Sequence, residues 1–131
     1  MQRFLLRGAL FLAVLATAAC ASSAASEMTP ASVAPDGAQR VTINVGDGMK
    51  FEPAAISLRA GQPTALTVRN AGQTQHDFTL SVGVAQPVKL AVNGGETATS
   101  TFTIDKPGTY TFECSEPGHA MAGMRGTITA Q

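Results

Sequence analysis

The stretch that decides the fold is GTYTFECSEPGHAMAGM, residues 108–124. In its first half, Tyr110, Phe112 and Cys114 alternate with polar residues. Such alternation predicts a β-strand that buries one face against a core. The Pro-Gly pair at 117–118 then predicts that the chain leaves this strand in a loop.

Apolar and polar residues alternate in the same way along most of the chain after residue 40. Short alternating runs, separated by turn residues such as Asn93-Gly94-Gly95, predict an all-β fold, a Greek-key β-sandwich of about seven to eight strands. The least regular run is 88–92. The other alternating apolar positions are Val41, Ile43, Val45, Ile56, Leu58, Leu66, Val68, Phe78, Leu80, Val82, Phe102, Ile104 and Ile128.

Three residues with metal-binding side chains, Cys114, His119 and Met124, follow one another at intervals of five. A thiolate, imidazoles and a weak thioether form the ligand set that suits copper in electron transfer. The chain has only two histidines, so His76 is left to supply a second imidazole. Met121 lies too close to His119 in sequence to reach the same metal from the required side.

Motifs in several places match those of one protein family. They are Gly108–Cys114, Pro117-Gly118-His119, Ala122–Gly126, Phe51-Glu52-Pro53 with Ile56, Leu58 and Gly61, and Asn70 followed by His76-Asp77-Phe78. With these motifs, residues 40–130 resemble the cupredoxins, the plastocyanin, azurin and auracyanin group.

The resemblance implies a role for each candidate ligand. His76, Cys114 and His119 would be the equatorial ligands of one copper ion that cycles between Cu(I) and Cu(II). Met124 would be the axial ligand. The outer edge of His119 would be the electron port, beside a small apolar patch at residues 120–122.

The ligand set favours a type 1 (blue) copper protein that shuttles single electrons between redox partner proteins of the cytochrome or oxidase type. Four ligands from the protein leave no coordination position for a substrate, so we expect a carrier and not an enzyme. Multicopper oxidases and nitrite reductases need further histidines, and a binuclear copper centre needs a second cysteine near Cys114, which this sequence lacks. Zinc rarely uses Met.

A second interpretation stays open, a periplasmic copper-binding module for copper delivery or storage. Such proteins usually offer several exposed Met or His ligands, whereas this chain has two histidines. The formal net charge of zero gives no basic surface for nucleic acid. We expect the protein to be a monomer.

The N-terminus has the pattern of an export signal. Two arginines precede an uncharged apolar run at 8–19, which is shorter than the roughly 20 residues that span a bilayer. Small residues before Cys20 resemble a lipobox, so residues 1–19 are expected to be a lipoprotein-type signal peptide and Cys20 the site of a lipid that anchors the protein to a membrane. The alternative is an ordinary signal cut after Ala21 or Ala25.

Composition divides the rest of the chain in two. Residues 20–39 are rich in Ala, Ser and Pro and predict a flexible tether, and residues 40–131 predict the copper-binding domain. We expect the domain on the periplasmic or cell-surface side of a membrane. Loss of the two signal arginines leaves seven Lys and Arg against nine Asp and Glu, a net charge of −2, which is too weak to name a partner. Cys114 is then a lone exported thiol, which a metal bond explains.

One residue departs from the family pattern and generates a prediction. The position after the first histidine is often Asn in cupredoxins and is Asp77 here. We expect its carboxylate to accept hydrogen bonds from Ser115 and its charge to favour Cu(II). Asp77→Asn should therefore raise the reduction potential measured by voltammetry, and an unchanged or lower potential would contradict the expectation.

Overall fold

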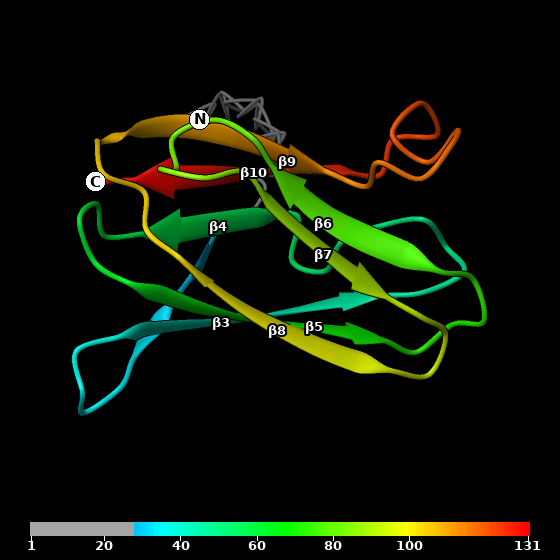
Figure 1. Ribbon diagram of the computed structural model, residues 1–131, viewed down its shortest axis with the longest axis horizontal. Coiled ribbons are helices and arrows are strands. Elements are labelled where there is room, and N and C mark those ends of the chain that lie inside the picture. The colour runs from blue at the N-terminus through cyan, green and yellow to red at the C-terminus, as the bar shows by residue number, and fades with distance from the viewer. Residues whose placement is uncertain (1–27) are drawn as a thin grey trace, which may run out of the picture.

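The computed structural model describes residues 28–131, which form two facing β-sheets (Figure 1). One sheet has the strand order β1-β4-β10-β9-β6-β7, and the other has the order β2-β3-β5-β8. The strands are β1 Thr29–Pro30, β2 Ser32–Val33, β3 Gln39–Val45, β4 Ala55–Leu58, β5 Thr64–Asn70, β6 His76–Leu80, β7 Val88–Val92, β8 Thr97–Phe102, β9 Gly108–Glu113 and β10 Arg125–Ala130. The predicted all-β sandwich is confirmed.

The core lies between the sheets and is built by the predicted alternation. Along β3, buried and exposed residues alternate without interruption, and Ile43 at its centre is fully buried. Phenylalanines fill the middle of the sandwich. The ring centroids of Phe78 and Phe112 are 4.8 Å apart, and those of Phe51 and Phe112 are 5.0 Å apart in an edge-to-face arrangement. Along the chain, Phe78 and Phe112 each lie two residues from a metal-binding residue, His76 and Cys114.

The strand expected from the alternation of Phe78, Leu80 and Val82 ends one apolar position early. Strand β6 stops at Leu80, whose register partner is Val88, and Val82 is 68% exposed instead of buried. The chain turns at Gly83, which has a φ of +83°, and the Tyr110 ring occupies the space that a Cβ would need. The irregular run 88–92 forms strand β7 at the edge of its sheet. Most of its side chains are only partly buried or exposed, so the strand needs fewer apolar residues than a central strand.

Part of the predicted tether belongs to the folded domain. Strand β1 pairs in parallel with β4, strand β2 pairs antiparallel with β3, and the N–H of Ala31 between them donates to the Ser57 carbonyl at 3.1 Å. The structure therefore places residues 29–33, which were expected in the tether, along paired strands of the domain. These residues use backbone bonds to unpaired strand edges, and such bonds require no apolar side chains. The predicted signal peptide and Cys20 lie outside the described residues.

The topology brings the candidate ligands to one end of the sandwich. Strands β6 and β9 are antiparallel neighbours, so the start of β6 at His76 lies beside the end of β9, just before Cys114. Strand β10 pairs with β9 and begins directly after Met124. At the opposite end, the Tyr110 hydroxyl donates to the Lys106 carbonyl at 2.8 Å and forms a tyrosine corner. The described residues contain no helix of the length and apolar character that crossing a bilayer requires.

Candidate metal centre

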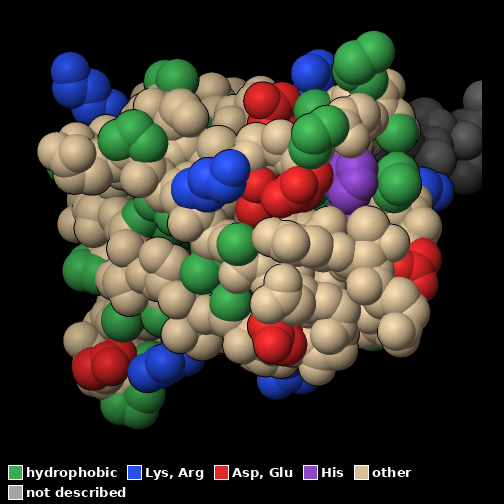
Figure 2. All heavy atoms as spheres, turned by 45° about the vertical axis from the view of Figure 1, so that its right-hand side comes forward, with side chains coloured by type: hydrophobic (Ala, Val, Ile, Leu, Met, Phe, Trp, Pro, Cys, Tyr) green, Lys and Arg blue, Asp and Glu red, His purple; other side chains and the backbone are tan. Residues whose placement is uncertain are grey.

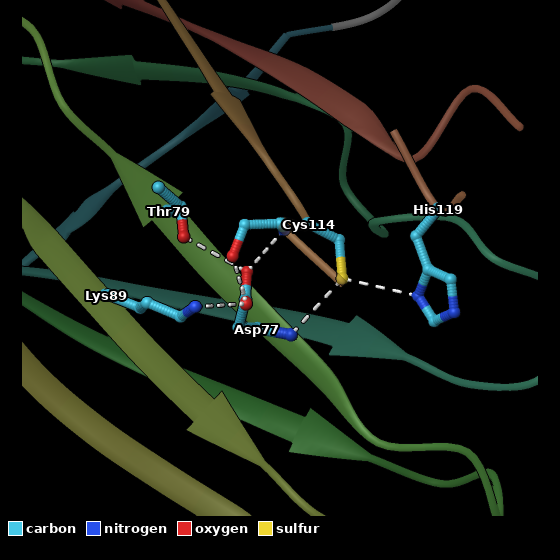
Figure 3. A network of polar contacts seen from close by, with 6 residues as sticks. Asp77, Thr79, Lys89, Cys114 and His119 are labelled. Carbon is cyan, nitrogen blue, oxygen red and sulfur yellow. Dashed lines mark hydrogen bonds and ion pairs between the residues drawn. The ribbon is translucent and has the colours of Figure 1, made fainter. Parts of the chain in front are cut away.

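Three of the four predicted ligands converge on one point. His76 and His119 face each other with their Nδ1 atoms 3.2 Å apart, and the Cys114 Sγ lies 3.4 Å from the Nδ1 of His119. Figure 3 shows the Cys114 sulfur directed at the His119 ring. One ligand atom from each residue lies within 4.8 Å of the other two, and all three residues are buried. This arrangement can hold a single ion between two imidazole nitrogens and a sulfur.

Met124 lies beside this cluster and is fully buried. Its carbonyl accepts a hydrogen bond from the Cys114 N–H at 3.1 Å, and its N–H donates to the His119 carbonyl at 3.0 Å. The backbone of Met124 is thus hydrogen-bonded to Cys114 and His119, the two other candidate ligands of the same loop. Its role as axial ligand stays a prediction.

The loop that carries Cys114, His119 and Met124 closes on itself. The His119 N–H donates to the Glu116 carbonyl at 3.1 Å, and the Ala122 N–H donates to the Gly118 carbonyl at 2.9 Å. Gly118 has a φ of +85°, a backbone conformation that residues with a side chain rarely adopt. The loop therefore presents its ligands from a backbone that is already folded.

Two residues hold the segment that leads into His76. The Asn70 side chain donates to the Thr74 carbonyl at 2.7 Å and accepts from the Gly72 N–H at 2.9 Å. Asp47, from the turn after β3, accepts from the N–H groups of Gln73 and Thr74 at 2.9 and 3.0 Å. These bonds, the one from Thr74 first, lower the pKa of Asp47. Sequence analysis missed Asp47, because nothing local links a residue of the 46–48 turn to a loop more than twenty residues later.

Asp77 ties the two metal-binding loops together. Its backbone N–H donates to the Cys114 sulfur at 3.4 Å (Figure 3), and its carboxylate accepts from the Ser115 N–H at 2.7 Å and the Ser115 hydroxyl at 2.6 Å. The expected bonds from Ser115 are confirmed. The carboxylate also faces the ammonium of Lys89 at 3.5 Å, a partner that sequence analysis missed.

The electrostatics of the site follow from its burial. Burial raises the pKa of the Asp77 carboxyl, but the hydroxyl and N–H of Ser115, with smaller contributions from Thr79 and Lys89, outweigh it and hold the pKa below its ordinary value. Burial, and then the neighbouring His119 ring, lower the pKa of His76. Burial raises the pKa of the Cys114 thiol. The metal-free site therefore favours a neutral imidazole and a protonated thiol, and a metal must displace the thiol proton.

The donor set fits copper. A sulfur and two imidazole nitrogens are ligands that copper accepts in both of its biological oxidation states, and calcium or magnesium would require oxygen ligands. The described ligand cluster contains no carboxylate. The Nδ1 of His76 is the nitrogen that faces the other ligands, 3.2 Å from the Nδ1 of His119, and its Nε2 is buried without a hydrogen-bond partner in the described part of the chain.

The surface over the site is apolar around one histidine. His119 is 9% exposed, whereas His76 and Cys114 are fully buried. Figure 2 shows a histidine at the surface with hydrophobic side chains beside it and acidic side chains on one flank. Met121, two residues after His119, is 91% exposed. Of the ligands, only His119 offers a route from the site to the surface.

Comparison with known proteins identifies the family and several relatives. The Cupredoxin-like domain family model matches residues 9–130. The copper-resistant cuproprotein CopI of Rubrivivax gelatinosus is 29% identical over 112 residues, which cover 72% of this chain and 68% of CopI. Plastocyanin of Prochlorothrix hollandica is 33% identical over 108 residues, which cover 76% of this chain and 79% of that plastocyanin.

Auracyanin-B of Chloroflexus aurantiacus is similar in both sequence and structure. It is 36% identical over 78 residues, which cover 56% of this chain and only 33% of that protein. The solved auracyanin B structure superposes with a TM-score of 0.63 at 25% identity, covering 70% of this chain and 88% of that structure. CopI is by its name a cuproprotein, and His76, Cys114 and His119 stand together here as candidate ligands of one metal ion.

The shifted pKa values predict how the stability of the metal-free protein depends on pH. His76 has a folded pKa below its ordinary 6.5, so the unfolded chain binds more protons below that pH and stability falls as pH decreases. Cys114 has a folded pKa above its ordinary 9.0, so stability falls as pH rises past that value. Urea unfolding under reducing conditions should therefore show the greatest stability between these two pH values.

The variant Cys114→Ser separates the two effects. Serine does not titrate in this range, so the decrease in unfolding free energy above pH 9.0 should become smaller while the decrease on the acid side stays. An alkaline slope that is the same in both proteins would contradict the assignment to Cys114.

Proposed function

The chain belongs to the cupredoxin-like family, and we propose that it is a type 1 (blue) copper protein that shuttles single electrons between redox partners. The observation that carries the proposal is the buried cluster of His76, Cys114 and His119, whose ligand atoms lie within 4.8 Å of one another. Copper, when bound, supplies the one-electron Cu(I)/Cu(II) couple. Met124 is proposed to complete the site as axial ligand.

The protein's own contribution is to hold the ligands in place. Cys114 and His76 are fully buried, so water is kept from the sulfur and from one imidazole. The bonds between Asp77 and Ser115 join the two ligand-bearing loops at 2.6 and 2.7 Å. Ligands that are already positioned rearrange little when the oxidation state changes. A closed site of this kind supports a carrier, because it offers no position for a substrate.

The route for the electron is proposed to pass through His119. It is the ligand that keeps some exposed surface, 9%, and Met121, two residues later, is almost fully exposed. A partner that buried this apolar surface would bring its own redox centre close to the imidazole. We propose proteins of the cytochrome or oxidase type as partners, each meeting a monomer of this chain.

The place of action is also proposed. The predicted signal peptide and the predicted lipid on Cys20 support an exported protein that is anchored to a membrane and works on its periplasmic or cell-surface side. The domain begins its first strand at Thr29, so a lipid at Cys20 would leave a short connection between anchor and domain.

The visible spectrum tests the proposal. Cu(II) added to the purified soluble domain should produce an intense blue thiolate-to-copper charge-transfer band, because the Cys114 sulfur lies beside the imidazoles. Cys114→Ser should abolish the band. A wild-type protein that binds Cu(II) without this band would contradict the proposal.

Two methionines provide a matched comparison of reduction potentials measured by voltammetry. Met124→Leu should shift the reduction potential, since the axial ligand tunes it, whereas the exposed Met121→Leu should leave it unchanged. Equal effects of the two changes would contradict the axial role of Met124.

The similarity to CopI favours copper delivery or storage as the second candidate function. The two functions differ in how firmly copper is held. A carrier with buried ligands should keep Cu(I) against a modest excess of chelator for hours, whereas a donor should release it within minutes. Transfer of copper can be followed by the absorbance of the chelator complex, with plastocyanin as the reference carrier. Rapid and complete release would favour delivery.

A further inference from the structure

Asp77 places a charged group inside the protein beside the sulfur ligand. Its side chain is fully buried, and its backbone N–H donates to the Cys114 Sγ at 3.4 Å. The carboxylate faces groups from three elements: Thr79 in β6 at 3.1 Å, Ser115 after β9 at 2.6 and 2.7 Å, and Lys89 in β7 at 3.5 Å. A buried charge so close to a redox centre acts on it strongly, because little water screens it.

Lys89 is the cation that compensates this charge. Lys89 in β7 pairs with Thr79 in β6. Its ammonium lies 3.5 Å from the Oδ2 of Asp77, two residues before Thr79 in β6 (Figure 3). Among the ion pairs of residues 28–131, it is the only cation within 4.0 Å of Asp77. The Lys89 side chain is 63% exposed, so its charge connects a buried carboxylate with the surface.

Lys89 is not needed to hold the loops. Ser115 provides two short hydrogen bonds to Asp77, and these bonds already join the loops that carry His76 and Cys114. A longer ion pair with an exposed partner adds little to stability. The feature that Lys89 alone supplies is a positive charge next to the carboxylate.

We propose that Lys89 sets the reduction potential of the metal centre by neutralising Asp77. This inference rests on the proposed function, because it concerns the same copper site. The oxidised site carries one more positive charge than the reduced site. A carboxylate without a counter-ion would stabilise the oxidised form, and Lys89 weakens that preference and keeps the potential higher. The pair, and not the carboxylate alone, is then the unit that tunes the site.

The test is the reduction potential of Lys89→Gln. Glutamine keeps a hydrogen-bond donor but removes the charge, so the potential should fall while the position of the blue band stays unchanged. Lys89→Arg, which keeps the charge, should behave like the wild type. Lys106→Gln removes the same charge from an exposed residue at the opposite end of β9 and should shift the potential much less.

A second variant series tests whether Lys89 acts through Asp77. In the Asp77→Asn background, Lys89→Gln should lower the potential less than it does in the wild type, which a double-mutant cycle measures. If Lys89→Gln and Lys106→Gln shift the potential equally, or if the effect is the same in both backgrounds, the inference is wrong.

The metal-free protein gives an independent measurement. The ¹⁵N–¹H spectrum of apo Lys89→Gln should change at the amides of Asp77, Thr79 and Ser115, and that of apo Lys106→Gln should not. If the signals of these amides did not change, the contact between Lys89 and Asp77 would be contradicted, and this result requires no bound copper. A wild type without a blue band would instead overturn the proposed function, so the two failures are distinguishable.

Discussion

The hydrogen bonds between Asp77 and the residues at the end of β9 are the interactions on which the site depends. The ladder between β6 and β9 has a single register pair, Thr79 with Glu113, so backbone pairing by itself leaves the ends of the two strands weakly connected. Asp77 supplies the missing connection through the Cys114 sulfur and through both donors of Ser115. These bonds hold Cys114 and Ser115 against the start of β6, where His76 lies.

The same residue introduces an electrostatic constraint. An amide at position 77 could make similar bonds without a charge, whereas a carboxylate has to be stabilised in a buried place. Ser115, Thr79 and Lys89 provide that stabilisation from three different elements. The result links an edge strand, β7, to the metal centre although β7 carries no ligand. The Asp77 side chain therefore contributes to the geometry of the site and, together with Lys89, to the charge beside it.

The parts of the site that were predicted are those with a local signature. Cys114, His119 and Met124 lie close together in the sequence, and the chain has only one other histidine, His76. The four candidate ligands can therefore be identified from composition and spacing. Asp47 and Lys89 carry no such signature, because they reach the site through turns and registers formed far away in sequence. Strands β1 and β2 were missed for a related reason: their residues are exposed and are held by backbone bonds to edges that exist only after folding.

The sequence by itself determined the class of fold and the chemistry of the donor atoms. Period-two alternation depends only on residues that are neighbours in one strand. The chemistry of a metal ligand depends only on the type of its side chain. Tertiary structure decided which end of the sandwich holds the ligands, how near the sulfur lies to the imidazoles, and which cation faces Asp77. Those distances depend on strand order and register. Strand order and register are set when the two sheets pack around Phe78 and its neighbours, so no single segment of the sequence determines them.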